Sequence, residues 1–279
     1  MNAHFRAFSF VDRIIPVHDG RRIRGRYTIP SEVVDFPLAL VGEAVGQLAA
    51  WAAMAAVNFD RRPVAGLAGS IELLLAPRAG QVLELAADLE NVDVESVEYS
   101  GTAHLDGRLV IRLQDCVGPM VPLADFDDPQ ALRNRFEELC QNGAEPGSFP
   151  GLPRMTLERV GGDAGRCASA TFHVPSDALL FADHFPRRPV FPGSLLMHLN
   201  LQLGAALASE ISPPAGRQWV AGTVLDMKLR SFIPPGAALQ LEAVLKQQAH
   251  DSASLTIETR TSKDLIATAR LLLKAEEAV

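Results

Sequence analysis

The residues of this chain best suited to acid–base chemistry lie in one segment, DHFPRRPVFPGSLLMHLNLQ, from Asp183 to Gln202. His184 stands near its start, and an imidazole titrates close to neutral pH, so it can accept or donate a proton under ordinary conditions. Three prolines in the next eight residues restrict the loop that carries this histidine. Pro192 and Gly193 then open an apolar helical stretch, and N–H groups at a helix start can stabilise developing negative charge.

A second candidate group lies far upstream. Residues 36–57 are almost entirely apolar except for Glu43 and Gln47, which are four residues apart and therefore share one face of a helix. The segment is long enough to cross a bilayer, but a carboxylate in mid-span is costly there. We therefore expect a helix buried inside a water-soluble protein, where apolar surroundings favour the neutral, proton-donating form of Glu43.

These two segments occupy equivalent positions of an internal repeat. Similar turn-and-strand sequences surround Gly80 and Gly236, which are 156 residues apart, and the apolar helical stretches begin near Pro37 and Pro192, which are 155 residues apart. Each half reads as a short strand, a loop, a long apolar helix and several strands. The strands expected after the helices span 65–75, 81–90, 94–105 and 108–117 in the first half, and 220–230, 238–249, 252–262 and 264–274 in the second.

A long apolar helix followed by antiparallel strands indicates an α+β fold, in which a curved antiparallel sheet wraps each of two central helices. The expected division is an N-terminal unit over 1–125, a helix and linker over 126–150, and a C-terminal unit over 151–279. The linker begins with a predicted helix over 127–140, which has an aspartate cap and a proline in its first turn. It ends in a stretch rich in glycine and proline.

The loop around His184 resembles the signature of the β-hydroxyacyl-acyl carrier protein dehydratases of fatty acid synthesis, which have the hot-dog fold. Their motif is H-F-P-x-x-P-x-x-P-G, followed by a helix with an acidic residue and, four positions on, a glutamine. The matching residues of this chain are His184, Phe185, Pro186, Pro189, Pro192, Gly193 and Gln202. The acidic position, however, holds His198. The resemblance, together with the repeat, implies a double hot-dog protein.

The first half supplies the missing acid. Its acidic position holds Glu43, whereas its histidine position holds Ile29. In the family that the loop resembles, two units pair, and each site takes its histidine from one unit and its acid from the other. The resemblance therefore implies one complete site, which combines His184 with Glu43, and one degenerate site that contains Ile29, His198 and Gln202.

The resemblance also implies a reaction, the dehydration of a 3-hydroxyacyl thioester to a trans-2-enoyl thioester. His184 is expected to remove the C2 proton, Glu43 to protonate the departing hydroxyl, and the Gly193 N–H to stabilise charge on the thioester oxygen. The Val190 carbonyl is expected to hold the other ring nitrogen of the histidine. Gln47 is expected either to orient Glu43 or to contact the carrier arm.

The expected substrate carrier is an acyl carrier protein or coenzyme A, as in fatty acid or polyketide biosynthesis, and no cofactor or metal is expected. No metal-ligand spacing joins the other histidines, His4, His18, His104, His173 and His250. The net charge of −7 argues against a general nucleic-acid binder. The N-terminus lacks the features of a signal peptide, which fits a cytoplasmic enzyme, and a homodimer of the double hot-dog is one expected assembly.

Two other functions fit parts of the pattern. A hot-dog acyl thioesterase also uses a carboxylate on the central helix, although the H-F-P-x-x-P-x-x-P-G loop argues against that activity. A non-catalytic acyl-binding protein is a further alternative, because degenerate repeats can lose catalysis and keep their binding cavity.

Overall fold

The computed structural model describes residues 4–16, 21–146 and 148–277. Its α-helices are α1 (Leu38–Ala56), α2 (Pro129–Gln141) and α3 (Gly193–Ala208). The first half of the chain contains the strands β1 (Arg13–Pro16), β2 (Arg22–Thr28), β3 (Arg61–Pro63), β4 (Leu67–Leu73), β5 (Val82–Val92), β6 (Ser96–Leu105) and β7 (Arg108–Pro122). The second half contains β8 (Glu158–Asp163), β9 (Cys167–His173), β10 (Arg217–Leu229), β11 (Ala238–Gln248), β12 (Ser252–Arg260) and β13 (Leu265–Glu277).

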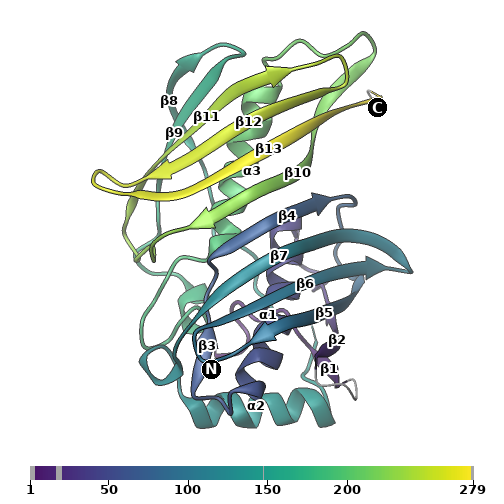
Figure 1. The fold of residues 1–279 in the computed structure, drawn as a ribbon, viewed down its shortest axis with the longest axis vertical. Helices are drawn as coiled ribbons and strands as arrows, with labels where there is room; N and C mark the ends of the chain where they lie inside the picture. Colours follow the sequence, from purple (N-terminus) through teal and green to yellow (C-terminus); the bar gives the residue numbers. More distant parts are fainter. Residues whose placement is uncertain (1–3, 17–20, 147, 278–279) are drawn as a thin grey trace.

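The strands form one continuous antiparallel sheet in which each half has the same strand order, read outward from the middle (Figure 1). The full order is β1-β2-β5-β6-β7-β4-β10-β13-β12-β11-β9-β8, with β3 beside β7. The strands β4, β7, β6, β5, β2 and β1 of the first half thus correspond to β10, β13, β12, β11, β9 and β8 of the second. The α+β prediction, with two repeated units that each surround a long helix, is confirmed.

The halves join where β4 pairs with β10. Ile71 lies opposite Val224 in this ladder, and Ala68 lies opposite Met227. Helices α1 and α3 contact each other behind this seam. Because each helix begins close to the seam, the start of α3 lies near the first half of the chain, and the two halves can contribute to one cavity.

Helix α1 is apolar on nearly all sides, and the sheet together with the neighbouring helix α3 covers most of its surface. Its buried residues include Leu40, Val45 and Leu48, and the strand β5 that packs on it alternates buried and exposed positions. Among the described residues, α1 is the one helix long and apolar enough to cross a membrane, and 61% of its most apolar window is buried inside the protein.

Helix α2 belongs to neither repeat and packs below the first sheet (Figure 1). Asp128 caps it by accepting hydrogen bonds from Gln130 N at 2.9 Å and Ala131 N at 3.0 Å, and Pro129 occupies the first position. The helix therefore begins two residues later than predicted. The domain boundaries at 125 and 150 stay a prediction.

Several strands extend beyond the limits that their sequence patterns indicate, most clearly β7, β10 and β13. Strand β7 continues to Pro122 because the short strand β3 pairs with its end, where Arg62 lies opposite Val121. Strand β13 continues to Glu277, which lies opposite Arg217 at the start of β10. Strand β3 has only three residues, one of them a proline, and so carries no alternating pattern. The sequence therefore did not predict it.

Candidate active site

His184 lies in the loop between a single 3-10 turn (Leu179–Ala182) and α3. Its Nδ1 lies 2.8 Å from the Val190 carbonyl oxygen, and the Val190 N–H donates to the His184 carbonyl at 3.0 Å. A carbonyl only accepts hydrogen bonds, so Nδ1 carries the proton and the neutral ring keeps a lone pair on Nε2. Burial lowers the pKa of His184, and the charge of Arg62 adds to this, while the charge of Glu43 and the Val190 hydrogen bond oppose it.

Glu43 is held by Gln47, one turn further along α1. Gln47 Nε2 donates to Glu43 Oε1 at 3.0 Å and to the Phe8 carbonyl at 2.9 Å, while its Oε1 accepts from Phe10 N at 2.8 Å. Both protons of the Gln47 amide are therefore in use within the protein. That Gln47 orients Glu43 stays a prediction. Because Glu43 Oε1 accepts a hydrogen bond, an acidic proton on this group belongs on Oε2.

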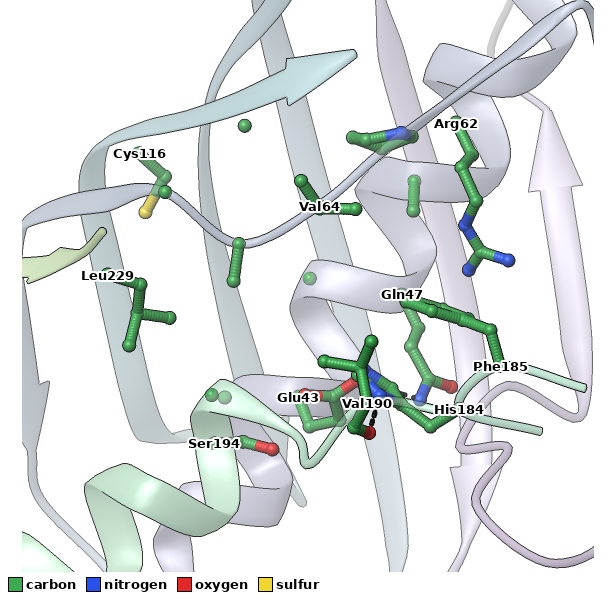
Figure 2. A pocket seen from close by; sticks show the side chains of 18 of the residues that line it. Glu43, Gln47, Arg62, Val64, Cys116, His184, Phe185, Val190, Ser194 and Leu229 are labelled. Carbon is green, nitrogen blue, oxygen red and sulfur yellow. Dashed lines mark hydrogen bonds between the residues drawn. The ribbon is translucent and has the colours of Figure 1, made fainter. Parts of the chain in front are cut away.

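The structure brings His184 and Glu43 together at one cavity of about 480 Å³, with Gly193 and Val190 also in its lining. Figure 2 shows the two side chains side by side, with Gln47 above them. The lining combines α1 from the first half with the loop and α3 from the second. A single catalytic site built from both halves is therefore geometrically available.

Gly193 is the first residue of α3, which has no side-chain cap at its N-terminus. The amides of this first turn therefore remain available to a ligand, and the helix dipole favours negative charge beside them. A Cβ on Gly193 would clash with the Leu229 side chain and would lie 3.5 Å from Ala65. A larger residue at this position would therefore require the Leu229 side chain to shift.

The N-terminal segment closes one side of the site through Asp183. The Asp183 carboxylate accepts hydrogen bonds from the backbone N–H groups of Phe5 and Phe8 and from the Ser9 hydroxyl. The Phe8 ring then meets the His184 ring edge to face, with centroids 5.7 Å apart. Residues before the first repeat therefore shape the site, although they carry no repeat signal in the sequence.

The residues of the predicted degenerate site lie outside the lining of this cavity. His198 Nε2 accepts a hydrogen bond from Gln202 Nε2 at 3.0 Å, and burial lowers the pKa of His198 against the opposing charge of Asp35. Ile29 is fully buried in the core of the first half. The inactivity of this second site stays a prediction.

Three polar residues of the cavity lining were not predicted from the sequence. Arg62 on β3 lies with its guanidinium carbon 3.6 Å above the centre of the Phe185 ring, and Asp127 lies 3.8 Å from Arg62 Nη1. His4 also lines the cavity, with Nε2 3.3 Å from Asp127 Oδ2. Their positions depend on long-range packing, so no local signal marked them. Of the other histidines, His18 lies outside the described residues.

Comparison with known proteins places the histidine loop in a family. The profile of the ApeI-like family, described as ApeI dehydratase, matches residues 162–269, which include His184 and Gly193. The matched segment is thus similar to hot-dog dehydratases of the FabA/FabZ type. A 3-hydroxyacyl-acyl-carrier-protein dehydratase FabZ of Moorella thermoacetica is 34% identical over 91 residues, 32% of this chain and 64% of that protein. The corresponding Clostridium acetobutylicum protein is 29% identical over 97 residues, 35% of this chain and 67% of that protein.

The matches to these curated dehydratases thus span about two thirds of their length and about a third of this chain. Solved structures are similar to this chain over most of its length. A protein of Lactobacillus plantarum described as an oleoyl thioesterase superposes with a TM-score of 0.61 over 92% of this chain and 97% of that chain, at 10% identity. At 10% sequence identity, this structural similarity concerns the fold alone. It shows a hot-dog fold in both halves of the chain.

Proposed function

We propose that this protein dehydrates 3-hydroxyacyl thioesters to trans-2-enoyl thioesters at one composite site. The observation that carries the proposal is the meeting, in one cavity, of a histidine with an unprotonated Nε2 and a carboxyl group oriented by Gln47. A base and an acid that face one substrate are what elimination of water requires.

In this mechanism the Gly193 N–H binds the thioester oxygen, which makes the C2 proton more acidic. His184 Nε2 takes that proton, and the electron pair of the C2–H bond forms the C2–C3 double bond as the C3–O bond breaks. Glu43 Oε2 gives its proton to the departing hydroxyl, which leaves as water. Proton return from the imidazolium to the carboxylate restores the starting state. The Val190 carbonyl stabilises the imidazolium formed in between through Nδ1–H.

A thioesterase is the second candidate, because a structural neighbour that covers most of the chain is described as an oleoyl thioesterase and Glu43 lies on the central helix. The test is to incubate the protein with 3-hydroxyacyl N-acetylcysteamine thioesters of graded length, and to measure enoyl thioester and free thiol in the same sample. Enoyl formation that requires His184 supports the dehydratase. Thiol release without enoyl formation identifies a thioesterase. If neither product forms, an acyl-binding role is the remaining alternative.

We further propose that the natural carrier is an acyl carrier protein or coenzyme A, in fatty acid or polyketide biosynthesis. We propose a cytoplasmic location away from the membrane, because α1 is mostly enclosed by protein. Pairing of two double hot-dogs into a homodimer is part of the same proposal, and sedimentation of the purified protein tests it.

A further inference from the structure

The cavity has one open side and one closed end. Among the described residues that line it, the exposed ones lie in the loops before β4, after β10 and near the end of β7, namely Ala65, Pro119, Arg230 and Ser231. A substrate carrier can therefore enter there. The end under α2 and the N-terminal segment is largely closed, since Val11, Leu132 and Leu139 are buried there and the His4 side chain is 16% exposed. In Figure 2, Leu229 and Arg62 lie on opposite sides of the view, with Val64 between them and Glu43 below.

Arg62 lies at this closed end. Its side chain is 12% exposed, and its Nε and Nη1 are buried without a hydrogen-bond partner among the described residues. Phe185 covers one face of the guanidinium, so the edge that carries the N–H groups remains for polar contacts. Burial lowers the pKa of Arg62 to about 10, which leaves the group charged at neutral pH.

The nearest counter-ion does not satisfy this cation. Asp127 lies 3.8 Å from Arg62 Nη1, beyond hydrogen-bond distance. Its Oδ1 accepts from the Asp128 N–H at 2.7 Å, and its Oδ2 interacts with His4 at 3.3 Å. Burial of a guanidinium with unpaired N–H donors destabilises the folded protein. An oxygen acceptor beside Arg62, in addition to Asp127, would remove that destabilisation.

We propose that the closed end binds an oxygen acceptor at the far end of the acyl group, best a carboxylate, through the unpaired edge of Arg62. The planar fork of a guanidinium matches a carboxylate in two parallel hydrogen bonds, and the surrounding Trp51, Met54 and Leu132 would cover the carbon chain. The inference rests on the proposed function, since the ligand is the acyl part of a thioester. It narrows the substrate class to acyl chains with a polar end.

The position of Arg62 argues for the acyl group and against the carrier arm. The carrier must remain attached through the open side, and the reacting carbons must lie between His184 and Glu43. The part of the substrate that continues past them into a closed end is the acyl chain. Because Arg62 lies two residues from Val64, whose N–H donates to the carbonyl of Pro119 at the open side, the test below also includes pantetheine thioesters, which report a contact with the carrier arm.

The test measures binding without turnover. Saturated acyl N-acetylcysteamine thioesters of graded length are prepared in pairs that end in a carboxylate or in an isopropyl group of similar shape. Trp51 lines the closed end, and Trp219 is the other tryptophan of the chain, so a Trp219→Phe background reports binding through Trp51 fluorescence. Arg62→Met removes the proposed contact. Arg61→Met is the matched control, because Arg61 lies outside the lining and donates to the Met120 carbonyl at 3.2 Å.

At the best chain length, the carboxylate ligand is expected to bind roughly ten- to hundredfold more tightly than its isopropyl partner, and Arg62→Met should abolish this preference. Arg61→Met should keep it. Equal binding of the two ligands, or a preference that survives in Arg62→Met, would overturn the inference. So would an Arg62→Met defect that appears with pantetheine thioesters of apolar acyl groups, which would assign Arg62 to the carrier arm.

If Arg62→Met fails to fold, Arg62→Lys serves in its place. Lysine keeps the positive charge but lacks the planar guanidinium, so it should reduce the preference for the carboxylate ligand. The failure of this inference is distinguishable from the failure of the proposed function. Dehydration of apolar substrates with no carboxylate preference rejects only the inference. A preference for the carboxylate ligand without any dehydration rejects only the proposed dehydratase function.

Discussion

The Glu43→Gln substitution tests the composite site most directly. Glutamine has nearly the shape of glutamate and keeps an oxygen that can accept the 3.0 Å hydrogen bond from Gln47 Nε2. What it cannot do is give a proton to the departing hydroxyl. The fold and the orientation of the side chain should therefore be retained while the acid function is lost.

A positioned general acid contributes about 10²- to 10⁴-fold to a rate. We therefore expect kcat to fall by about that factor, which corresponds to about 3–5 kcal/mol of transition-state stabilisation. KM should change little, because the carboxyl acts on the leaving group rather than on the carrier. The melting temperature should stay close to that of the unmodified protein, since the Gln47 contact is preserved.

The assay is steady-state formation of the enoyl thioester as a function of pH. Because the mechanism uses Glu43 in its protonated, neutral form, Glu43→Gln should lower the height of the kcat/KM profile and leave its acid limb near the same pH. His198→Ala is the matched control, because His198 occupies the acidic position of the second half and lies outside the cavity lining. Its activity should stay near that of the unmodified protein. Full activity in Glu43→Gln, or loss of activity only in His198→Ala, would refute the shared-site reasoning.

Three further outcomes follow from the same contacts. Because burial lowers the pKa of His184 below 6.5, kcat/KM of the unmodified protein should still be high at pH 6.5 and fall only under more acidic conditions; a midpoint above 6.5 contradicts this. Gly193→Ala should destabilise the protein by about 1–3 kcal/mol in chemical denaturation, because its Cβ meets Leu229, and Leu229→Ala in the same chain should relieve the effect. Burial raises the pKa of Asp12 to about 6 from 3.8, so its contribution to stability is present below pH 4 and is lost as the pH rises through 6. Asp12→Asn should therefore raise the free energy of unfolding at pH 8, by at most about 3 kcal/mol and less after solvent screening, with no gain at pH 4; an equal gain at both pH values would show another cause.

The sequence alone determined the repeated architecture of this protein. An apolar helix with one carboxylate and strands with period-two alternation are local patterns, and local patterns repeat when a unit is duplicated. The offset between Pro37 and Pro192 then aligned Glu43 with His198 and so predicted which half supplies the acid. The starts of the two long helices and the approximate limits of most strands followed from the same patterns, because residues along a strand alternate between the buried and the exposed face.

The tertiary structure decided what surrounds the catalytic pair. Strand β3 is three residues long, and only its pairing with the end of β7 brings Arg62 over Phe185. The hydrogen bonds from residues 5–9 to Asp183, and from Gln47 to Phe8, join segments up to 178 residues apart. Such contacts have no periodicity in the sequence, because they depend on how whole elements pack rather than on local conformation. The sequence could therefore indicate the acid and the base, whereas the shape and charge of the closed end of the cavity emerged only from the folded chain.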